Sequence, residues 1–343
     1  MLFSRNLFKY SFMLSFLLVL SSIFIGQSTS FMLKTSLVNQ NEVATPLSSQ
    51  IYELHSPILI ESDGDFGSYT FNGTGSREDP YLIEGYNITR YGWLTMAIDI
   101  RNTHSFFIIT HCVIYAEYIG IKLDNVQTGT SKIIENRFYS LIEDGGAITL
   151  SNTQNCTIEG NIGTNFMQGI HLNEADNNII KNNYFYDIND QGISIRYSNS
   201  NNITNNRIRN SKAHGIALVG ISNNNIIHHN IIEGCAWGNN YNIDGVQYNI
   251  NPTSQGYDEG YQNTWYDSEN KQGNTWSDYF GIGPYHIDGT ANAFDLYPNH
   301  TTGLTPFIII IITTPILIGL VLVIYQFYYK KRKHQKREKK DSD

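Results

Sequence analysis

The sequence predicts an all-β fold, a parallel β-solenoid in which short strands stack from coil to coil. The first observation is a repeat of apolar pairs, which recur at Ile98/Ile100, Ile121/Leu123, Ile148/Leu150, Ile170/Leu172, Ile193/Ile195 and Ile216/Leu218. Their second members lie 23, 27, 22, 23 and 23 residues apart, and a fixed period of about 20 to 50 residues is typical of solenoids. The second observation is that the apolar stretches are short, rich in β-branched residues and bounded by Asn, Gly and Ser.

The first 30 residues have the three-part form of a secretory signal peptide. Arg5 and Lys9 precede an apolar run from about Phe12 to Ile25, and small polar residues follow, with cleavage expected just after Gly26. An uncleaved N-terminal anchor is the alternative, although the run is short for a membrane span. Residues 31–50 are interpreted as a linker, and residues 51–298 as a solenoid ectodomain of about seven or eight coils.

The coils are unusually rich in asparagine, and stacking explains why. Successive coils of a solenoid lie about 4.8 Å apart, so a corner position recurs in register from one coil to the next. A column of Asn side chains can then hydrogen-bond along the axis, as in other stacked β structures. Asn also tolerates the left-handed backbone that a sharp corner needs. Asparagine is therefore predicted to be structural here, and single Asn residues are poor candidates for a functional site.

The coil pattern resembles that of single-stranded right-handed parallel β-helix proteins of the pectate-lyase-like superfamily. Two end segments narrow the resemblance to NosD-type β-helix proteins: "GTGSREDPYLIEGYNIT" at 73–89 is similar to their first coil, and "GNTWSDYFGIGPYHIDGTANAFDLYP" at 273–298 to their closing segment. The resemblance covers about residues 55–298. It implies a right-handed β-helix, a carbohydrate-binding or sugar-hydrolase relative, and an accessory role toward the copper centre of nitrous oxide reductase.

A C-terminal cap is expected from about residue 257. An open solenoid end exposes bare strand edges and an apolar core, which a bulky segment must cover. The aromatic residues available for this are Trp265, Tyr266, Trp276, Tyr279, Phe280, Tyr285 and Tyr297. Sugar binding by these aromatic residues is the functional alternative to capping.

The C-terminal end of the sequence predicts a type I, single-pass membrane protein. Residues 299–306 are a short juxtamembrane linker, and residues 307–329 are apolar over about the length that a bilayer core requires. The tail, residues 330–343, is rich in Lys and Arg, which keeps such a flank on the cytoplasmic side. The solenoid would then lie outside the cell membrane.

The charge distribution excludes nucleic acid as the expected partner. The chain has a net charge of −8; the tail carries eight basic and three acidic residues and the first 30 residues two basic ones, which leaves −15 between them. So acidic an ectodomain repels polyanions, but it suits a calcium-containing exterior. The sequence identifies no cofactor, and calcium is retained as a candidate.

Cysteines and glycosylation sequons fit an exported protein. The cysteines are Cys112, Cys156 and Cys235, which have no metal-ligand spacing and are expected to be buried thiols, with one disulfide as the alternative. The candidate N-glycosylation sites are Asn72, Asn87, Asn155, Asn202 and Asn299.

The outward face of one strand row gives the candidate binding site. Because Ile and Leu of each Gly-Ile-x-Leu point inward, the alternate residues point outward. They would form a mixed-charge strip of Lys122, Asp124, His171, Asn173 and Arg196, edged by Asp190 and His214 at turns. An ordinary solvated sheet face is the alternative interpretation.

The strip does not define a reaction. Glycoside hydrolysis needs two facing carboxyl groups, and the strip offers Asp124 alone, so catalytic residues stay unknown. Copper prefers imidazole, thiolate or thioether ligands; His228 and His229 are adjacent, and on a strand they would face opposite sides. No metal ligand is assigned.

The function expected from the sequence is binding at the cell surface, to a glycan or another component of the cell envelope. The first alternative is a carbohydrate-active enzyme, a polysaccharide lyase or glycoside hydrolase, acting on the strip. The second is a NosD-like accessory protein for a surface copper enzyme. The sequence does not decide whether the chain is an enzyme, and it favours a binding protein.

Overall fold

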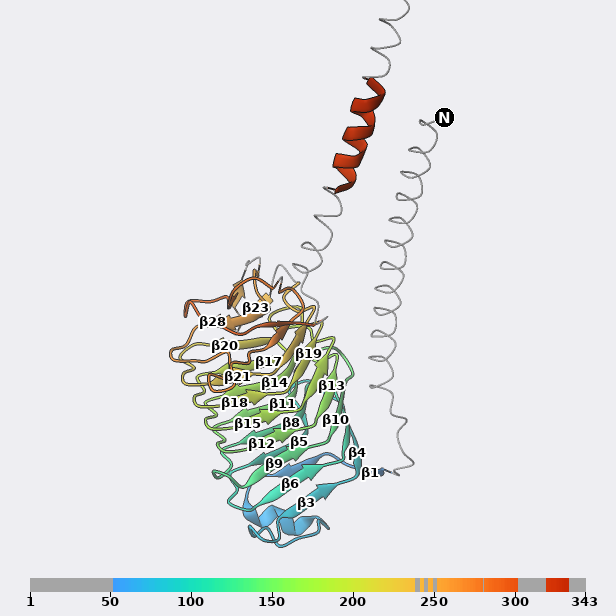
Figure 1. Cartoon of the computed structure of the whole chain (residues 1–343). Helices are drawn as coiled ribbons and strands as arrows, with labels where there is room; N and C mark the ends of the chain where they lie inside the picture. The colour runs from blue at the N-terminus through green and yellow to red at the C-terminus, as the bar shows by residue number, and fades with distance from the viewer. Residues whose placement is uncertain are drawn as a thin grey trace, which may run out of the picture. The chain divides into compact units, whose positions relative to one another are not determined.

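The computed structural model describes residues 52–237, 241–243, 246–248, 252–279, 281–301 and 319–332. The predicted signal segment and linker, the first part of the predicted membrane span and most of the tail lie outside the described residues. Residues 52–301 contain three long sheets, and every strand pair within these sheets is parallel (Figure 1). Together they form a β-solenoid of about nine turns, rather than the seven or eight predicted.

Most coils contribute one strand to each of the three sheets, whereas the closing coils add strands to the first and second sheets only. The first sheet contains β1 (Glu53–His55), β4 (Tyr86–Arg90), β7 (Val113–Ala116), β10 (Arg137–Ser140), β13 (Ile162–Thr164), β16 (Tyr184–Tyr186), β19 (Arg207–Arg209), β22 (Ile231–Glu233), β26 (Thr275–Trp276) and β29 (Asn299–His300). The second contains β2 (Ile58–Ile60), β5 (Met96–Arg101), β8 (Ile119–Asp124), β11 (Gly146–Ser151), β14 (Gln168–Asn173), β17 (Ile193–Arg196), β20 (Ile216–Val219) and β25 (Gly256–Asp258). The third contains β3 (Tyr81–Glu84), β6 (Phe107–Thr110), β9 (Ser131–Ile134), β12 (Thr157–Glu159), β15 (Ile179–Lys181), β18 (Asn202–Thr204) and β21 (Ile226–His228).

The remaining elements are short. A 3-10 helix, η1 (Asp63–Ser68), precedes β3, and two antiparallel hairpins pair β23 (Tyr241–Ile243) with β24 (Val246–Tyr248) and β27 (Tyr285–His286) with β28 (Phe294–Asp295). Residues 319–332 form an α-helix. Within the described part of the chain, no helix combines the length and apolarity needed to cross a bilayer.

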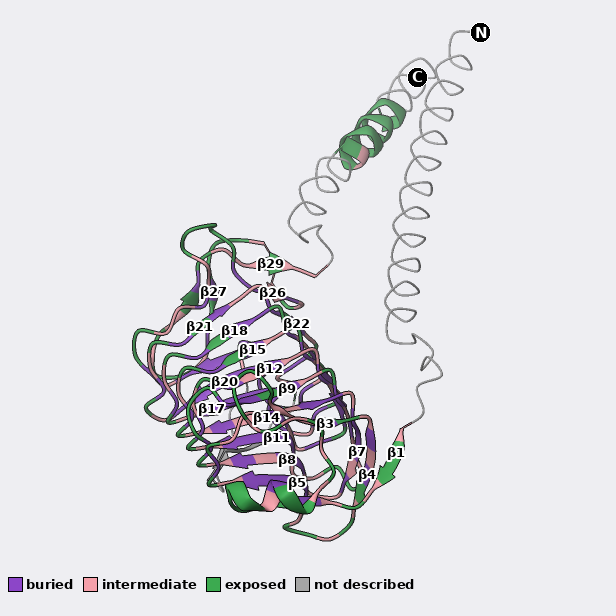
Figure 2. Ribbon diagram, turned by 90° about the horizontal axis from the view of Figure 1, so that it is seen from below, coloured by how far each residue is buried: buried purple, intermediate pink, exposed green. Residues whose placement is uncertain are grey.

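The core is built from the apolar pairs that the repeat predicts. Ile98, Ile121, Ile148, Ile170, Ile193 and Ile216 are register partners from β5 to β20 and are fully buried. Figure 2 shows buried positions repeating along the stacked strands, with exposed residues gathered at turns. Phe138 and Phe185 fill the interior beside these columns. The inward orientation predicted for Ile and Leu is confirmed.

Two columns of buried Asn side chains run along the corners. In the first, each side-chain amide donates to the Oδ1 of the next at 2.9 to 3.1 Å, through Asn136, Asn161, Asn183, Asn206, Asn230 and Asn274. The second comprises Asn178, Asn201, Asn225 and Asn263. The same Oδ1 atoms accept backbone N–H groups of the neighbouring coil. These amides satisfy backbone groups that water cannot reach, so the structural role predicted for asparagine is confirmed.

The Asn-Asn doublets divide two tasks between their members. In the doublets Asn182-Asn183 and Asn205-Asn206 the first Asn has left-handed backbone, with φ of 58° and 56°, and the second joins the buried column. Left-handed backbone is the conformation that Asn adopts more readily than other non-glycine residues. The doublets are therefore corner signatures.

Cysteines occupy column positions as well. The backbone N–H of Cys112 donates to Asn136 and that of Cys156 to Asn178, so each thiol stands where the next coil has Asn. All three cysteines are free and buried. Burial raises the pKa of Cys112 to about 11 and that of Cys156 to about 12. The expectation of buried thiols is confirmed.

Both ends of the solenoid are covered. At the N-terminal end, Phe66 of η1 is buried and stacks on Tyr81 at 4.4 Å. At the other end, Trp265 and Trp276 are fully buried, and Tyr285 stacks on Trp276 at 4.2 Å. These rings act as the predicted cap; Phe280 lies outside the described residues.

The cap also ends the two Asn columns on aspartate. Asp295 accepts the backbone N–H of Asn274 at 2.7 Å, and Asp258 accepts the side-chain amide of Asn263 at 2.8 Å. Each carboxylate also accepts an indole N–H at 2.9 Å, from Trp276 and Trp265 respectively. Burial raises the pKa of both carboxyl groups, although these donors counteract it.

Replacing one column Asn is expected to destabilise the solenoid strongly. Asn183→Ala removes the donor to the carbonyls of Ile158 and Lys181 and the acceptor for Asn161, which should cost about 3 kcal/mol, the upper end for orphaning a buried polar group. The control Asn202→Ala changes an exposed strand Asn and should cost less than about 0.5 kcal/mol. Urea unfolding of both variants measures this; equal midpoints for the two would contradict the column's role.

Candidate functional site

The predicted strip lies on the outer face of the second sheet. Strand register places Lys122, His171 and Ser194 in one outward row and Asp124, Asn173 and Arg196 in the next. Lys122, Asp124, His171, Asn173 and Arg196 are all partly exposed. The structure therefore brings these five predicted residues onto one face.

Within the strip, the charged groups interact with each other. Lys122 Nζ lies 2.9 Å from Asp124 Oδ2, and the Arg196 guanidinium lies over the ring of Tyr197. Burial, and secondly the charge of Arg196, lower the pKa of His171 to about 4. The imidazole of His171 is therefore neutral at pH 7, and its Nδ1 has no hydrogen-bond partner among the described residues.

The two residues predicted to edge the strip are buried instead. Asp190 is 3% exposed and His214 is fully buried. Small or apolar outward residues, Ala217, Val219 and Tyr257, close this end of the face as a separate buried cluster with Ala213. The accessible strip therefore runs from Lys122 to Arg196 only.

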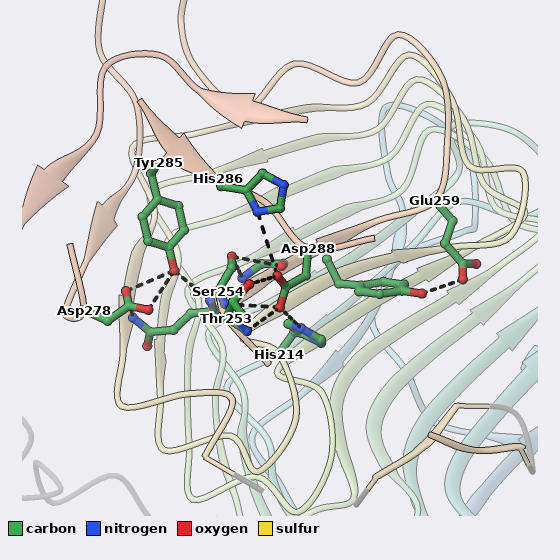
Figure 3. A network of polar contacts seen from close by, with 11 residues as sticks. His214, Thr253, Ser254, Glu259, Asp278, Tyr285, His286 and Asp288 are labelled. Atoms are coloured by element: carbon green, nitrogen blue, oxygen red, sulfur yellow. Dashed lines mark hydrogen bonds and ion pairs between the residues drawn. The ribbon is translucent and has the colours of Figure 1, made fainter. Parts of the chain in front are cut away.

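His214 belongs to a polar network that attaches the cap (Figure 3). Asp288 accepts hydrogen bonds from the backbone N–H groups of Thr253 and Ser254 and lies 3.4 Å from His214 Nε2. Burial acts to raise the pKa of Asp288, but the hydrogen bonds from His214 and Thr253 outweigh it, and the pKa is lowered. The pKa of His214 is lowered by burial. This network joins the cap to the last coils and is structural.

A groove that the sequence analysis did not anticipate opens at the turns leading from the first sheet into the second. It has a volume of about 500 Å³ and is lined by Glu143, Asn165, Asp187, Ile188, Asn189, Asn210, Lys212, Gly234, Cys235 and Trp237. The side chain of Trp237 is 60% exposed. Asn189 donates to Glu143 and Asn210 to Asp187, which fixes both carboxylates. The groove thus combines an exposed indole with fixed amide and carboxylate groups.

Sequence reasoning missed the groove because its residues come from turns of several coils. Glu143, Asp187 and Lys212 are far apart in the sequence and belong to no repeated position of the Gly-Ile motif. The one available signal was Trp237, a large aromatic residue just after the last regular coil. Four candidate glycosylation residues, Asn72, Asn155, Asn202 and Asn299, are exposed, and Asn87 is half-buried.

The expectation that His228 and His229 face opposite sides is wrong. His228 ends β21, but His229 has left-handed backbone with φ of 58°, which turns its ring toward that of His228. The Nδ1 atoms of the two rings are in hydrogen-bond contact, and the ring centroids are 4.7 Å apart. One ligand atom from each ring and one from Asp267 lie within 4.8 Å of one another. Burial, and secondly the neighbouring His229, lower the pKa of His228.

Comparison with known proteins supports the fold but indicates no ligand, activity or partner. Residues 120–257 match the family model described as the right handed beta helix region, so this part of the solenoid is a right-handed parallel β-helix. Searches among curated proteins and among solved structures gave no significant match.

The pKa of His171 offers a direct test of the strip's electrostatics. We expect His171 to titrate near pH 4 in an NMR titration, and Arg196→Gln to raise this pKa while leaving it below the ordinary 6.5, because burial remains. Since the folded state binds the proton less tightly than the unfolded state, stability should fall as the pH drops from 6.5 toward 4. A His171→Gln variant assigns the signal; titration of His171 near 6.5 would contradict the desolvation of its ring.

Proposed function

We propose that this protein binds glycans at the outer surface of the cell through the groove beside Trp237. The observation that carries the proposal is an exposed indole within a groove of about 500 Å³ that also presents Asn165, Asn189 and Asn210. Aromatic faces pack against the apolar face of a sugar ring, while a few placed polar groups fix its orientation. The mixed-charge strip on the adjoining sheet would extend the contact along a longer chain.

The charges of the groove favour an uncharged glycan. It contains two carboxylates, Glu143 and Asp187, and one ammonium group, Lys212. The exported part of the chain is acidic as well, so uronic acid polymers would be repelled unless calcium mediates their binding. The likeness to NosD-type proteins supports a surface role in general terms; it rests on the two end segments and stays a prediction, as does an accessory role toward a copper enzyme.

Binding to a glycan array by the full chain in detergent tests the proposal. Trp237→Ala should weaken binding at least 10-fold, about the effect of losing one aromatic contact worth 1.4 kcal/mol. The matched control is Trp93→Ala, because Trp93 is 71% exposed and does not line the groove. Arg196→Ala and His171→Ala report on the strip. Binding that is insensitive to Trp237→Ala, or absent for every glycan, would contradict the proposal that this groove binds glycans.

A glycoside hydrolase is the second candidate, because two carboxylates line the same groove. Retaining and inverting hydrolysis both require a pair of carboxyl groups on either side of the scissile bond. Glu143 and Asp187 could supply that pair. Product analysis of a bound oligosaccharide, with Glu143→Gln and Asp187→Asn as controls, separates turnover from simple binding.

We further propose that the chain is exported and anchored by residues 307–329, with the basic tail in the cytoplasm. The support is the apolar run followed by a Lys- and Arg-rich flank. In the described helical residues, apolar side chains are exposed, including Val321 at 59%, Leu322 at 56% and Ile324 at 58%. Exposed apolar side chains of this kind are stabilised by lipid.

Labelling with a membrane-impermeant maleimide tests this topology. The three native thiols are buried and should not react, so single introduced cysteines report their own location. In intact cells Ser268→Cys, at an exposed turn, should be labelled and Ser342→Cys in the tail should be protected until the cells are lysed. Labelling of Ser342→Cys in intact cells would refute the proposed orientation.

A further inference from the structure

We propose that His228, His229 and Asp267 form a binding site for a divalent transition-metal ion of the zinc class. The three side chains come from two successive coils and converge at one corner of the solenoid. The site is distinct from the glycan groove, because none of these residues lines the groove.

The corner geometry places two imidazoles on one side of the chain. His229 stands in the corner row that Asn182 and Asn205 occupy in earlier coils, and it has the same left-handed backbone, with φ of 58° at His229. Its backbone N–H donates to the carbonyl of Gly273 at 2.9 Å, which fixes the corner against the next coil. The side chain is therefore held on the outside of the solenoid, where its Nδ1 meets Nδ1 of His228.

The carboxylate is held in place by its own loop. Asp267 and Gln272 form an isolated antiparallel bridge, with backbone hydrogen bonds of 2.7 and 3.2 Å in both directions. Asp267 Oδ1 accepts the N–H groups of Glu269 and Asn270, and Oδ2 accepts the side-chain amide of Asn270 at 2.7 Å. A carboxylate has about four acceptor positions, so these bonds orient it and leave capacity for a metal ion.

A second interaction fixes the ring of His229. Its Nε2 contacts Oε1 of Gln272, and a ring that donates Nε2–H to this amide oxygen keeps the Nδ1 lone pair, which faces Nδ1 of His228. Histidine ligands in metalloproteins commonly donate their other ring nitrogen to an oxygen in this way. Gln272 therefore acts as a positioning residue.

The donor set and its spacing select the class of metal. Two ligand atoms bound to a tetrahedral zinc ion lie about 3.3 Å apart, and here all three lie within 4.8 Å of one another. Imidazole nitrogen suits zinc and its neighbours, whereas calcium and magnesium prefer sets of oxygen ligands. All three side chains are partly exposed, so water can complete the coordination. A bound ion would link the coil that contains β21 to the loop that contains Asp267.

Zinc binding by the full chain in detergent, stripped with a chelator, tests the site. Competition with a chromophoric chelator should give one tight site, and Co²⁺ in place of Zn²⁺ should give the visible absorption of a tetrahedral complex. His228→Gln, His229→Asn and Asp267→Asn should each weaken affinity by more than about 100-fold, while Gln272→Ala should cost about 10- to 100-fold, as outer-shell partners do. Asn is chosen at 229 because it tolerates the left-handed backbone.

The control is His104→Gln, which removes an exposed histidine beside Asp63 in an early coil. It should leave zinc affinity unchanged. Zinc should also raise the melting temperature of the wild type and of this control, but not that of the three ligand variants. Absence of tight binding, or affinity that the ligand substitutions leave unchanged while circular dichroism stays β-rich, would overturn the proposal.

Discussion

The solenoid depends on satisfying the backbone at its corners. At each corner the chain changes direction while its backbone is buried, and a buried N–H or C=O group without a partner costs about 1–3 kcal/mol. The two Asn columns meet this requirement, because their side chains bond to backbone groups and, in most coils, to the amide of the next coil. Since a corner can bond only to a corner in register, the same contacts fix how coils stack.

Fixed stacking also determines where function can reside. The inward positions are committed to the core and the column positions to the corners, so only outward strand residues and turns remain free to vary. The groove beside Trp237 and the His228–His229–Asp267 cluster both lie at such positions. Outward positions in turns carry no core contact, so their side chains can differ from coil to coil, which explains how a regular scaffold carries irregular sites.

The sequence predicted the regular part well, for a physical reason. Apolar pairs such as Ile170/Leu172 and doublets such as Asn182-Asn183 answer to local rules of strand and corner geometry that repeat in every coil. Sites formed between coils follow no such rule. No pattern in the sequence indicated that Asp190 would be buried, or that Asp187 and Glu143 would line one groove. The error at His229 arose because a single left-handed residue breaks the alternation of a strand.

The hydrogen bonds between the side-chain amides of the Asn columns all run in one direction. In each of these amide-to-amide bonds the donor lies in the earlier coil, and the last acceptors, the carboxylates of Asp295 and Asp258, have no N–H with which to continue the series. Each interior coil therefore presents an Asn Oδ1 acceptor to the coil before it and an Asn side-chain N–H donor to the coil after it. Duplication or loss of a whole interior coil would preserve every such bond, whereas loss of the closing coil would not. Changes in the length of this protein over evolution should thus be confined to its middle.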